Sequence, residues 1–192
     1  MRLTLEFDGG SRGNPGPAGA GVVLRADDGA PLVAVGRFIG RATNNVAEYR
    51  ALIAGLEKAI ELGATRLDVF GDSELIIRQM TGRYRVKHPD LVPLHRKAAE
   101  LAARIGEVRF EHNLRHHNRL ADRLANLAMD RRADVDDADE PPTPQAPPLE
   151  AGEVHECPRC GAVIEVRKMP ESQERHAGAF TCICGATMNR GG

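Results

Sequence analysis

Residues 1–21, MRLTLEFDGGSRGNPGPAGAG, begin with a strand pattern that stops at a carboxylate. Over residues 3–7, apolar and polar side chains alternate, which is the period of a half-buried strand. A stretch rich in Gly, Asn and Pro follows Asp8, and we expect it to form a loop. It matches neither GxGxxG nor GxxxxGK[ST], and residues 18–25 after it have a second strand pattern rather than a helical one. A nucleotide-binding loop is therefore disfavoured, and Asp8 requires another explanation.

The remaining patterns alternate between helix and strand. Further strands are predicted over 18–25, 32–39, 67–71 and 107–114, and helices over 45–62, 73–80, 93–105 and 118–131. The turn DDGA joins the second and third strands as a hairpin. The order βββαβααβα predicts an α/β fold with a mixed five-stranded sheet, antiparallel over its first three strands and flanked by helices.

Charge divides the 192 residues into three parts. Residues 1–132 carry 21 basic and 16 acidic side chains, and residues 157–192 carry five and three. Residues 133–156 between them carry eight acidic side chains and none that is basic. We expect a catalytic domain over 1–132, an acidic Pro-rich linker over 133–153 and a small domain over 154–192. The mildly basic outer parts are compatible with a nucleic-acid partner.

The chain has neither a signal-peptide pattern nor an apolar run near the ~20 residues of a membrane helix. All four cysteines follow residue 156 in two close pairs, which favours a metal site in a reducing compartment over a disulfide framework. We therefore expect a cytoplasmic protein without membrane association, and a monomer.

Four carboxylates occupy positions that a globular core does not ordinarily favour. Asp8 and Asp72 each end a predicted strand, and Glu48 and Asp122 each lie in the first turn of a predicted helix. Each has an ordinary explanation by itself. Asp8 suits a turn, Glu48 suits a capping box with Asn45, Asp72 suits a helix cap, and Asp122 suits the positive end of a helix.

Taken together, the four carboxylates indicate a metal centre. Strand ends and helix starts meet at one rim of an α/β sheet, and carboxylates that converge there repel one another. Divalent cations relieve that repulsion, and ligands that are all oxygen favour Mg²⁺ or Mn²⁺. Two such ions can activate a water and stabilise a leaving alkoxide in phosphodiester cleavage.

Four motifs of this chain resemble the type 1 ribonuclease H family, in this order and spacing. They are DGGSRGNPGPAG, GRATNNVAEYRAL, VFGDSELIIRQMTGRY and N-x-x-AD-x-LAN, and the resemblance covers residues 1–131. It implies the RNase H-like fold and an endonuclease that cuts the RNA strand of RNA–DNA hybrids by a two-metal-ion mechanism with Mg²⁺ or Mn²⁺. Asp8, Glu48, Asp72 and Asp122 become the catalytic, metal-binding carboxylates.

The resemblance also implies which residues contact the hybrid. Asn14, Asn44 and Asn45 are expected in its minor groove, and Arg41 and Thr43 at a phosphate of the DNA strand. Gly9 and the Gly-rich stretch would let the backbone approach the substrate closely, where amide groups can test for a 2′-OH.

Two features depart from well-studied bacterial members of the family. Those members carry a basic, Trp-containing insertion that grips the hybrid, whereas this chain has only GRYRVKHP over 82–89 and no Trp. The family often uses a loop histidine to help the product leave. His116 or His117 would serve here, with a solvated loop histidine as the alternative, and His112 is expected to be structural.

The cysteine pairs resemble a zinc ribbon over about residues 154–189. Cys157 and Cys160 form a C-x-x-C, Cys182 and Cys184 form a C-x-C, and 21 residues separate the two pairs. We expect one structural Zn²⁺, because a segment this small needs a staple to fold. The C-x-C departs from the usual spacing, so a histidine, His155 or His176, is an alternative ligand. A loose tail with incidental thiols is the other alternative.

The role of the ribbon stays open between nucleic-acid binding and a protein partner. Two other functions also remain open for the first domain: a catalytically reduced nucleic-acid-binding module of the same fold, and a DNA-acting nuclease of the wider fold. Four intact carboxylates oppose the first, since binding alone gains nothing from their repulsion. The GNPG and TNN stretches oppose the second, since they match loops that read the hybrid.

Overall fold

The structure is a computed structural model that describes residues 1–112, 118–136, 154–156, 163–165 and 189–190. The chain divides into two compact units, Met1–Glu140 and Pro141–Gly192. The elements of the first unit are β1 (Arg2–Ser11), β2 (Gly16–Arg25), β3 (Pro31–Ala42), α1 (Asn44–Glu61), β4 (Arg66–Gly71), α2 (Glu74–Met80), α3 (Leu91–Ile105), β5 (Glu107–His112), α4 (Arg119–Arg131) and β6 (Val135–Asp136).

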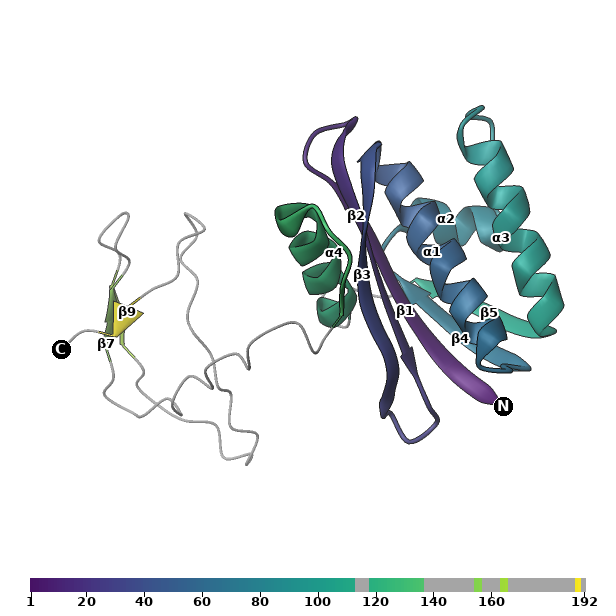
Figure 1. Ribbon diagram of the computed structural model, residues 1–192, viewed down its shortest axis with the longest axis horizontal. Coiled ribbons are helices and arrows are strands. Elements are labelled where there is room, and N and C mark those ends of the chain that lie inside the picture. The colour runs from purple at the N-terminus through teal and green to yellow at the C-terminus, as the bar shows by residue number, and fades with distance from the viewer. Residues whose placement is uncertain (113–117, 137–153, 157–162, 166–188, 191–192) are drawn as a thin grey trace. The chain divides into compact units, whose positions relative to one another are not determined.

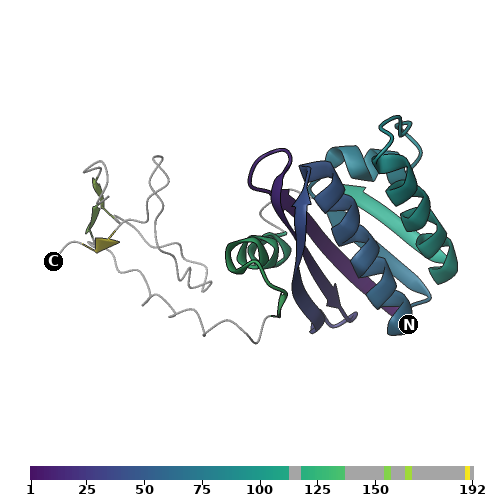
Figure 2. The same ribbon diagram turned by 45° about the horizontal axis from the view of Figure 1, so that its top comes forward.

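The first unit contains one mixed sheet with the strand order β5-β4-β1-β2-β3-β6. Strands β1, β2, β3 and β6 pair antiparallel in turn, whereas β1, β4 and β5 pair parallel. Helices α1, α2 and α3 cover one face of the sheet, and α4 packs on the other (Figures 1 and 2). The predicted α/β fold with an antiparallel start is confirmed.

The sheet has six strands, and the prediction of five was wrong. The additional strand β6 pairs with the middle of β3 and lies in the stretch that the sequence assigned to the linker. Its Val135 is buried beside α4, and the preceding Asp134 accepts a hydrogen bond of 3.0 Å from Phe38 N and forms an ion pair of 2.7 Å with Arg37. A two-residue strand in an acidic stretch has no periodic pattern that a sequence can reveal.

The strand β1 runs three residues past Asp8, although a loop was expected there. Gly9 and Gly10 pair with β2, and Ser11 lies opposite Ala18. The connection to β2 is therefore the short segment 12–15. Pairing with a neighbouring strand outweighs the low strand propensity of glycine at these positions.

The main core lies between the sheet and α1. Its largest fully buried side chains in β1 and α1 are Leu3, Leu5, Phe7, Tyr49, Leu52 and Leu56. The predicted helix over 45–62 is observed one residue earlier, because Thr43 caps it by accepting a hydrogen bond of 3.4 Å from Val46 N. The capping box between Asn45 and Glu48 is thus not the arrangement that starts α1.

The second unit contains a small antiparallel sheet with the order β8-β7-β9. Its strands are β7 (Val154–Glu156), β8 (Val163–Glu165) and β9 (Asn189–Arg190). The four cysteines, His176, His116 and His117 lie outside the described residues, so the expectations for them stay predictions. Within the described part of the chain, no helix has the length and apolar character needed to span a membrane.

Candidate active site

Two of the predicted carboxylates lie side by side because of the register of a parallel strand pair. Phe7 of β1 is opposite Gly71 of β4, so Asp8 within β1 and Asp72 directly after β4 follow at adjoining positions of neighbouring strands. Asp72 comes directly after β4, and Ser73 rather than Asp72 is the N-cap residue of α2. The helix-cap explanation for Asp72 is therefore wrong, and its carboxylate is placed by the strand.

Helix α1 brings Glu48 to these two residues. A Cβ on Gly9 would lie 2.1 Å from Glu48 N, so only a glycine lets the helix approach β1 this closely. Glu48 is 4 % exposed and Asp8 is 8 % exposed, which is unusual for carboxylates in a core. Close approach of helix and strand thus buries two acidic groups beside each other.

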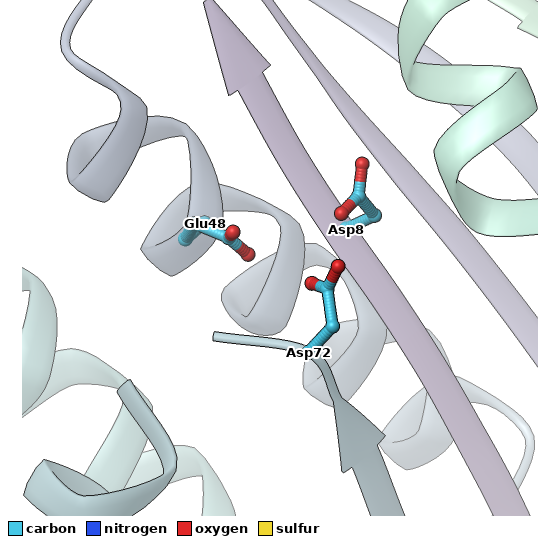
Figure 3. Close-up of side chains that lie close together, drawn as sticks. All are labelled: Asp8, Glu48 and Asp72. Carbon is cyan, nitrogen blue, oxygen red and sulfur yellow. The ribbon is translucent and has the colours of Figure 1, made fainter. Parts of the chain in front are cut away.

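Asp8, Glu48 and Asp72 converge on one point. One carboxylate oxygen from each lies within 4.8 Å of the other two, and the three side chains face a common space between β1, β4 and α1 (Figure 3). Three converging carboxylates offer only hard oxygen ligands, which suit Mg²⁺ or Mn²⁺. The residues therefore fit a divalent cation.

Asp122 lies on the wall of the same site rather than within the group of three. It shares a hollow of about 390 Å³ with Asp8 and Glu48. A Cβ on Gly21 would lie 1.9 Å from Ala121 O, and Gly21 is directly opposite Asp8 in the β1–β2 pair. The first turn of α4 is therefore pressed against the sheet beside Asp8, and this contact brings Asp122 to the site.

The hollow also contains residues that sequence reasoning did not single out. They are Gly10, Ser11, Arg12, Asn126 and Met129. Asn126 Nδ2 donates to Asp122 O at 2.9 Å and to Asp122 Oδ1 at 3.2 Å. The signal was available, since a polar residue four positions after a helical carboxylate lies on the same face of the helix.

The predicted hybrid-contacting residues gather around the start of α1. Asn14 Oδ1 accepts a hydrogen bond of 3.1 Å from Asn44 N, and this bond ties the β1–β2 connection to the helix. Asn44 also lines the hollow, while Asn45 is exposed one residue further along α1. Arg41 is exposed near the end of β3 and pairs with Pro17 of β2.

Two hydrogen bonds support the site from behind. His112 Nε2 lies 3.1 Å from Asp72 O, so the end of β5 is joined to the residue that carries a carboxylate. Tyr49 directly follows Glu48 in the chain, and its hydroxyl donates a hydrogen bond of 2.7 Å to Gln79 Oε1. Burial raises the pKa of the Tyr49 phenol well above its ordinary value.

The sheet order, the helix placement and the carboxylate group define an α/β protein of the RNase H-like fold with an acidic centre for divalent cations. Comparison with known proteins agrees. Residues 6–128 match the reverse transcriptase-like family. The crystal structure of RNase H1 from Halobacterium salinarum is 45 % identical, with a TM-score of 0.67 over 68 % of this chain and 99 % of that one.

A second solved structure, LC11-RNase H1 in complex with an RNA/DNA hybrid, is 42 % identical with a TM-score of 0.65. It matches 68 % of this chain and 98 % of that one. The chain belongs to the ribonuclease H family, as its four motifs predicted.

Some curated relatives are longer than this chain. The bifunctional protein Rv2228c of Mycobacterium tuberculosis is 53 % identical over 143 residues, which are 74 % of this chain and 39 % of that protein. The chain thus spans about two fifths of the length of that relative.

Proposed function

We propose that the first unit is an endoribonuclease that hydrolyses the RNA strand of RNA–DNA hybrids. The observation that carries this proposal is the group of Asp8, Glu48 and Asp72, whose carboxylate oxygens lie within 4.8 Å of one another. The similar LC11-RNase H1 was solved with an RNA/DNA hybrid, which supports this substrate class.

The carboxylates Asp8, Glu48, Asp72 and Asp122 would hold two divalent cations. Bound Mg²⁺ or Mn²⁺ supplies an activated water and neutralises the charge of the leaving oxygen. The chain contributes a rigid arrangement of ligands, because Asp8 and Asp72 are fixed by the sheet and Glu48 by a capped helix. Asn126 would orient the Asp122 carboxylate through its hydrogen bond of 3.2 Å to Oδ1.

Residues at the start of α1 would recognise the hybrid. Asn14, Asn44 and Asn45 offer amide donors and acceptors for the minor groove, where a 2′-OH distinguishes RNA from DNA. Arg41 and Thr43 would bind a phosphate of the DNA strand, and Gly9, which lines the hollow, would meet the substrate through its backbone. The bond from Asn44 N to Asn14 Oδ1 leaves the amide group of Asn14 available to donate.

A cleavage assay tests the proposed activity. Labelled RNA–DNA hybrid, duplex RNA and duplex DNA are each incubated with Mg²⁺, with Mn²⁺ and with EDTA. We expect cleavage of the hybrid with either cation and none with EDTA. Cleavage of duplex DNA instead would favour a DNA-acting nuclease, and tight binding without cleavage would favour a binding module.

Two matched substitutions assign the activity to the carboxylates. Asp72→Asn is nearly isosteric and removes a charged ligand, so hybrid cleavage should fall by about 100-fold or more while the thermal midpoint changes little. Asp68→Asn, in the strand that precedes Asp72, removes a carboxylate that instead pairs with Arg2 at 2.8 Å, and it should leave cleavage intact. Equal activity of the two variants would contradict the metal-centre assignment.

For the second unit we propose a zinc ribbon over about 154–189 that holds one Zn²⁺ through Cys157, Cys160, Cys182 and Cys184. The support is topological, since residues 157–162, which contain CPRCG, connect the antiparallel strands β7 and β8. Metal analysis should find about one zinc per chain, less in Cys157→Ser, and an unchanged amount in the control Ser172→Ala. Full zinc content in the cysteine variant would exclude this ligand set.

A further inference from the structure

Asn118 is a buried amide that links two segments bearing carboxylates. It is 1 % exposed, and its Nδ2 donates to Phe7 O at 2.7 Å across 111 positions of sequence. Phe7 directly precedes Asp8 in β1. The backbone oxygen of Asn118 accepts a hydrogen bond of 3.0 Å from Asp122 N, at the start of α4. One residue therefore connects the backbone beside Asp8 with the backbone of Asp122.

Asp130, near the opposite end of α4, forms an exposed ion pair with Arg12, whereas the contacts near the start of the helix are largely apolar. They bury Val23, Ala121 and Leu124 and bring the helix against glycines of β2 and β3. Packing of this kind sets how closely α4 approaches the sheet, but its energy depends on buried area and it has no donor direction. A short, buried hydrogen bond requires one donor direction, so it fixes the helix start at a defined place.

We propose that Asn118 is a positioning residue that sets where Asp122 lies relative to Asp8. This inference rests on the proposed function and deepens it, because it concerns the fourth carboxylate of that site. Asp122 lines the hollow with Asp8 but stands outside the group within 4.8 Å, so its location depends on α4 as a whole. A displacement of about 1 Å at a catalytic group can lower a rate by about 100-fold.

A general loss of stability is the competing explanation. A buried amide that loses its partner destabilises a protein wherever it lies, at a cost of about 1–3 kcal/mol. Such a loss would lower activity only through unfolding. The experiment must therefore distinguish a displacement of Asp122 from a loss of stability of α4.

The full-length protein is compared with Asn118→Leu, Asn118→Ser and Val23→Ala. Leucine keeps the approximate volume and removes the donor, and serine serves as a second variant should leucine prevent folding. Val23→Ala weakens the packing of α4 on β2 without touching the hydrogen bond. Each protein is assayed at least 15 °C below its own thermal midpoint. For a chain of this size, that interval corresponds to roughly several kcal/mol in the free energy of unfolding.

In the Asn118 variants we expect kcat for the hybrid to fall by about 10- to 100-fold while KM stays within about 2-fold, the pattern of a lost positioning contact. Calorimetric titration with Mn²⁺ and no hybrid should show weaker binding in the same variants. Val23→Ala should keep both kcat and Mn²⁺ affinity. A loss of kcat in Val23→Ala as large as that in the Asn118 variants would overturn the proposal, as would unchanged Mn²⁺ affinity in those variants.

A double-mutant cycle gives the deciding result. If Asn118 acts through Asp122, then adding Asn118→Leu to Asp122→Asn should lower the remaining kcat by less than about 3-fold. If the loss of kcat in the double variant equals the product of the losses in the two single variants, the proposal is overturned. Failure of the wild-type protein to cleave the hybrid would instead overturn the proposed function, and the Mn²⁺ titration would still report whether Asn118 positions the carboxylate.

Discussion

At the scale of single residues, the site is built by backbone register more than by contacts between functional side chains. Asp8 and Asp72 come together because Phe7 and Gly71 are paired in a parallel ladder. Glu48 joins them because Gly9 has no side chain to hold α1 away. The acidic groups oppose their own convergence, so the energy that assembles them comes from the buried core around Phe7 and Leu52.

The buried pair of Tyr49 and Gln79 gives a prediction about stability behind the site. Tyr49→Phe removes the hydroxyl that donates to Gln79 Oε1 and leaves a buried acceptor unsatisfied, so unfolding free energy near neutral pH should fall by about 1–3 kcal/mol. Chemical denaturation of both proteins at pH 8 measures the difference. A stability equal to wild type would mean that Gln79 finds another partner.

The same pair predicts an effect of alkaline pH. Burial raises the pKa of Tyr49 in the folded state above the value of about 10 in the unfolded chain. Its contribution is fully present below pH 10 and is lost as pH rises from there through the folded pKa, because the unfolded state then releases the proton first. The stability difference between wild type and Tyr49→Phe should therefore narrow between pH 8 and pH 11. A constant difference would contradict the raised pKa.

At the scale of elements, the distance of α4 from the sheet decides where Asp122 lies. Gly21→Ala would place a methyl group 1.9 Å from Ala121 O, a backbone atom that cannot move without the helix. We expect a loss of about 1–3 kcal/mol, as for other overpacked sites, together with reduced hybrid cleavage. Thermal unfolding and cleavage assays on the same preparation measure both.

A matched control lies one strand away. A Cβ on Gly10 would meet only the end of the flexible Met129 side chain, at 3.2 Å. Gly10→Ala should therefore cost less than Gly21→Ala in thermal stability. If the two variants unfold at the same temperature, close packing of α4 on Gly21 is not what holds the helix in place.

Elements with long periodic patterns were predictable from the sequence, and short or paired ones were not. The apolar spacing in α1 identified that helix to within one residue. Composition suggested a loop after Asp8, but pairing with β2 extends β1 through Ser11. The start of α3 was placed at Pro93, whereas the helix begins at Leu91, because proline is tolerated in a first turn whose N–H groups have no intrahelical partner.

The candidate site was likewise predictable from the sequence only in part. Carboxylates at strand ends and helix starts indicated a shared rim, and three of them do converge. The place of Asp122 on the wall of the hollow depends on the packing of α4, which periodicity does not specify. Asn118 appeared in the sequence only as part of a motif, since its bond to Phe7 O joins segments that lie far apart in the chain.

At the scale of the whole molecule, the chain has two stretches of net positive charge, one on either side of an acidic stretch. Residues 1–132 have a net charge of +5, from 21 basic and 16 acidic side chains. The segment 82–89 is short, with exposed Arg83, Arg85 and Lys87. The hydroxyl of Tyr84 in this segment accepts a hydrogen bond of 2.7 Å from Arg78 Nη1. This segment thus offers three exposed basic side chains with which to bind a hybrid.

We predict that the second unit strengthens binding of the hybrid. Residues 157–192 have a net charge of +2, from five basic and three acidic side chains, and are tethered to the first unit by an acidic Pro-rich stretch. A tether raises the effective concentration of a weak second site, so even poor intrinsic affinity can strengthen binding. Each phosphate contact also makes association more dependent on salt.

A comparison of the full chain with a fragment of residues 1–136, which keeps β6, tests this role. The fragment should show a higher KM for the hybrid with little change in kcat, because uniform binding is lost while the carboxylate centre is kept. Its binding should also decline less steeply as salt rises, since fewer phosphate contacts are made. If the second unit instead docks a protein partner, both proteins would show the same KM and the same salt slope on naked hybrid. Measuring both constants at two salt concentrations therefore separates a substrate clamp from a protein-binding module.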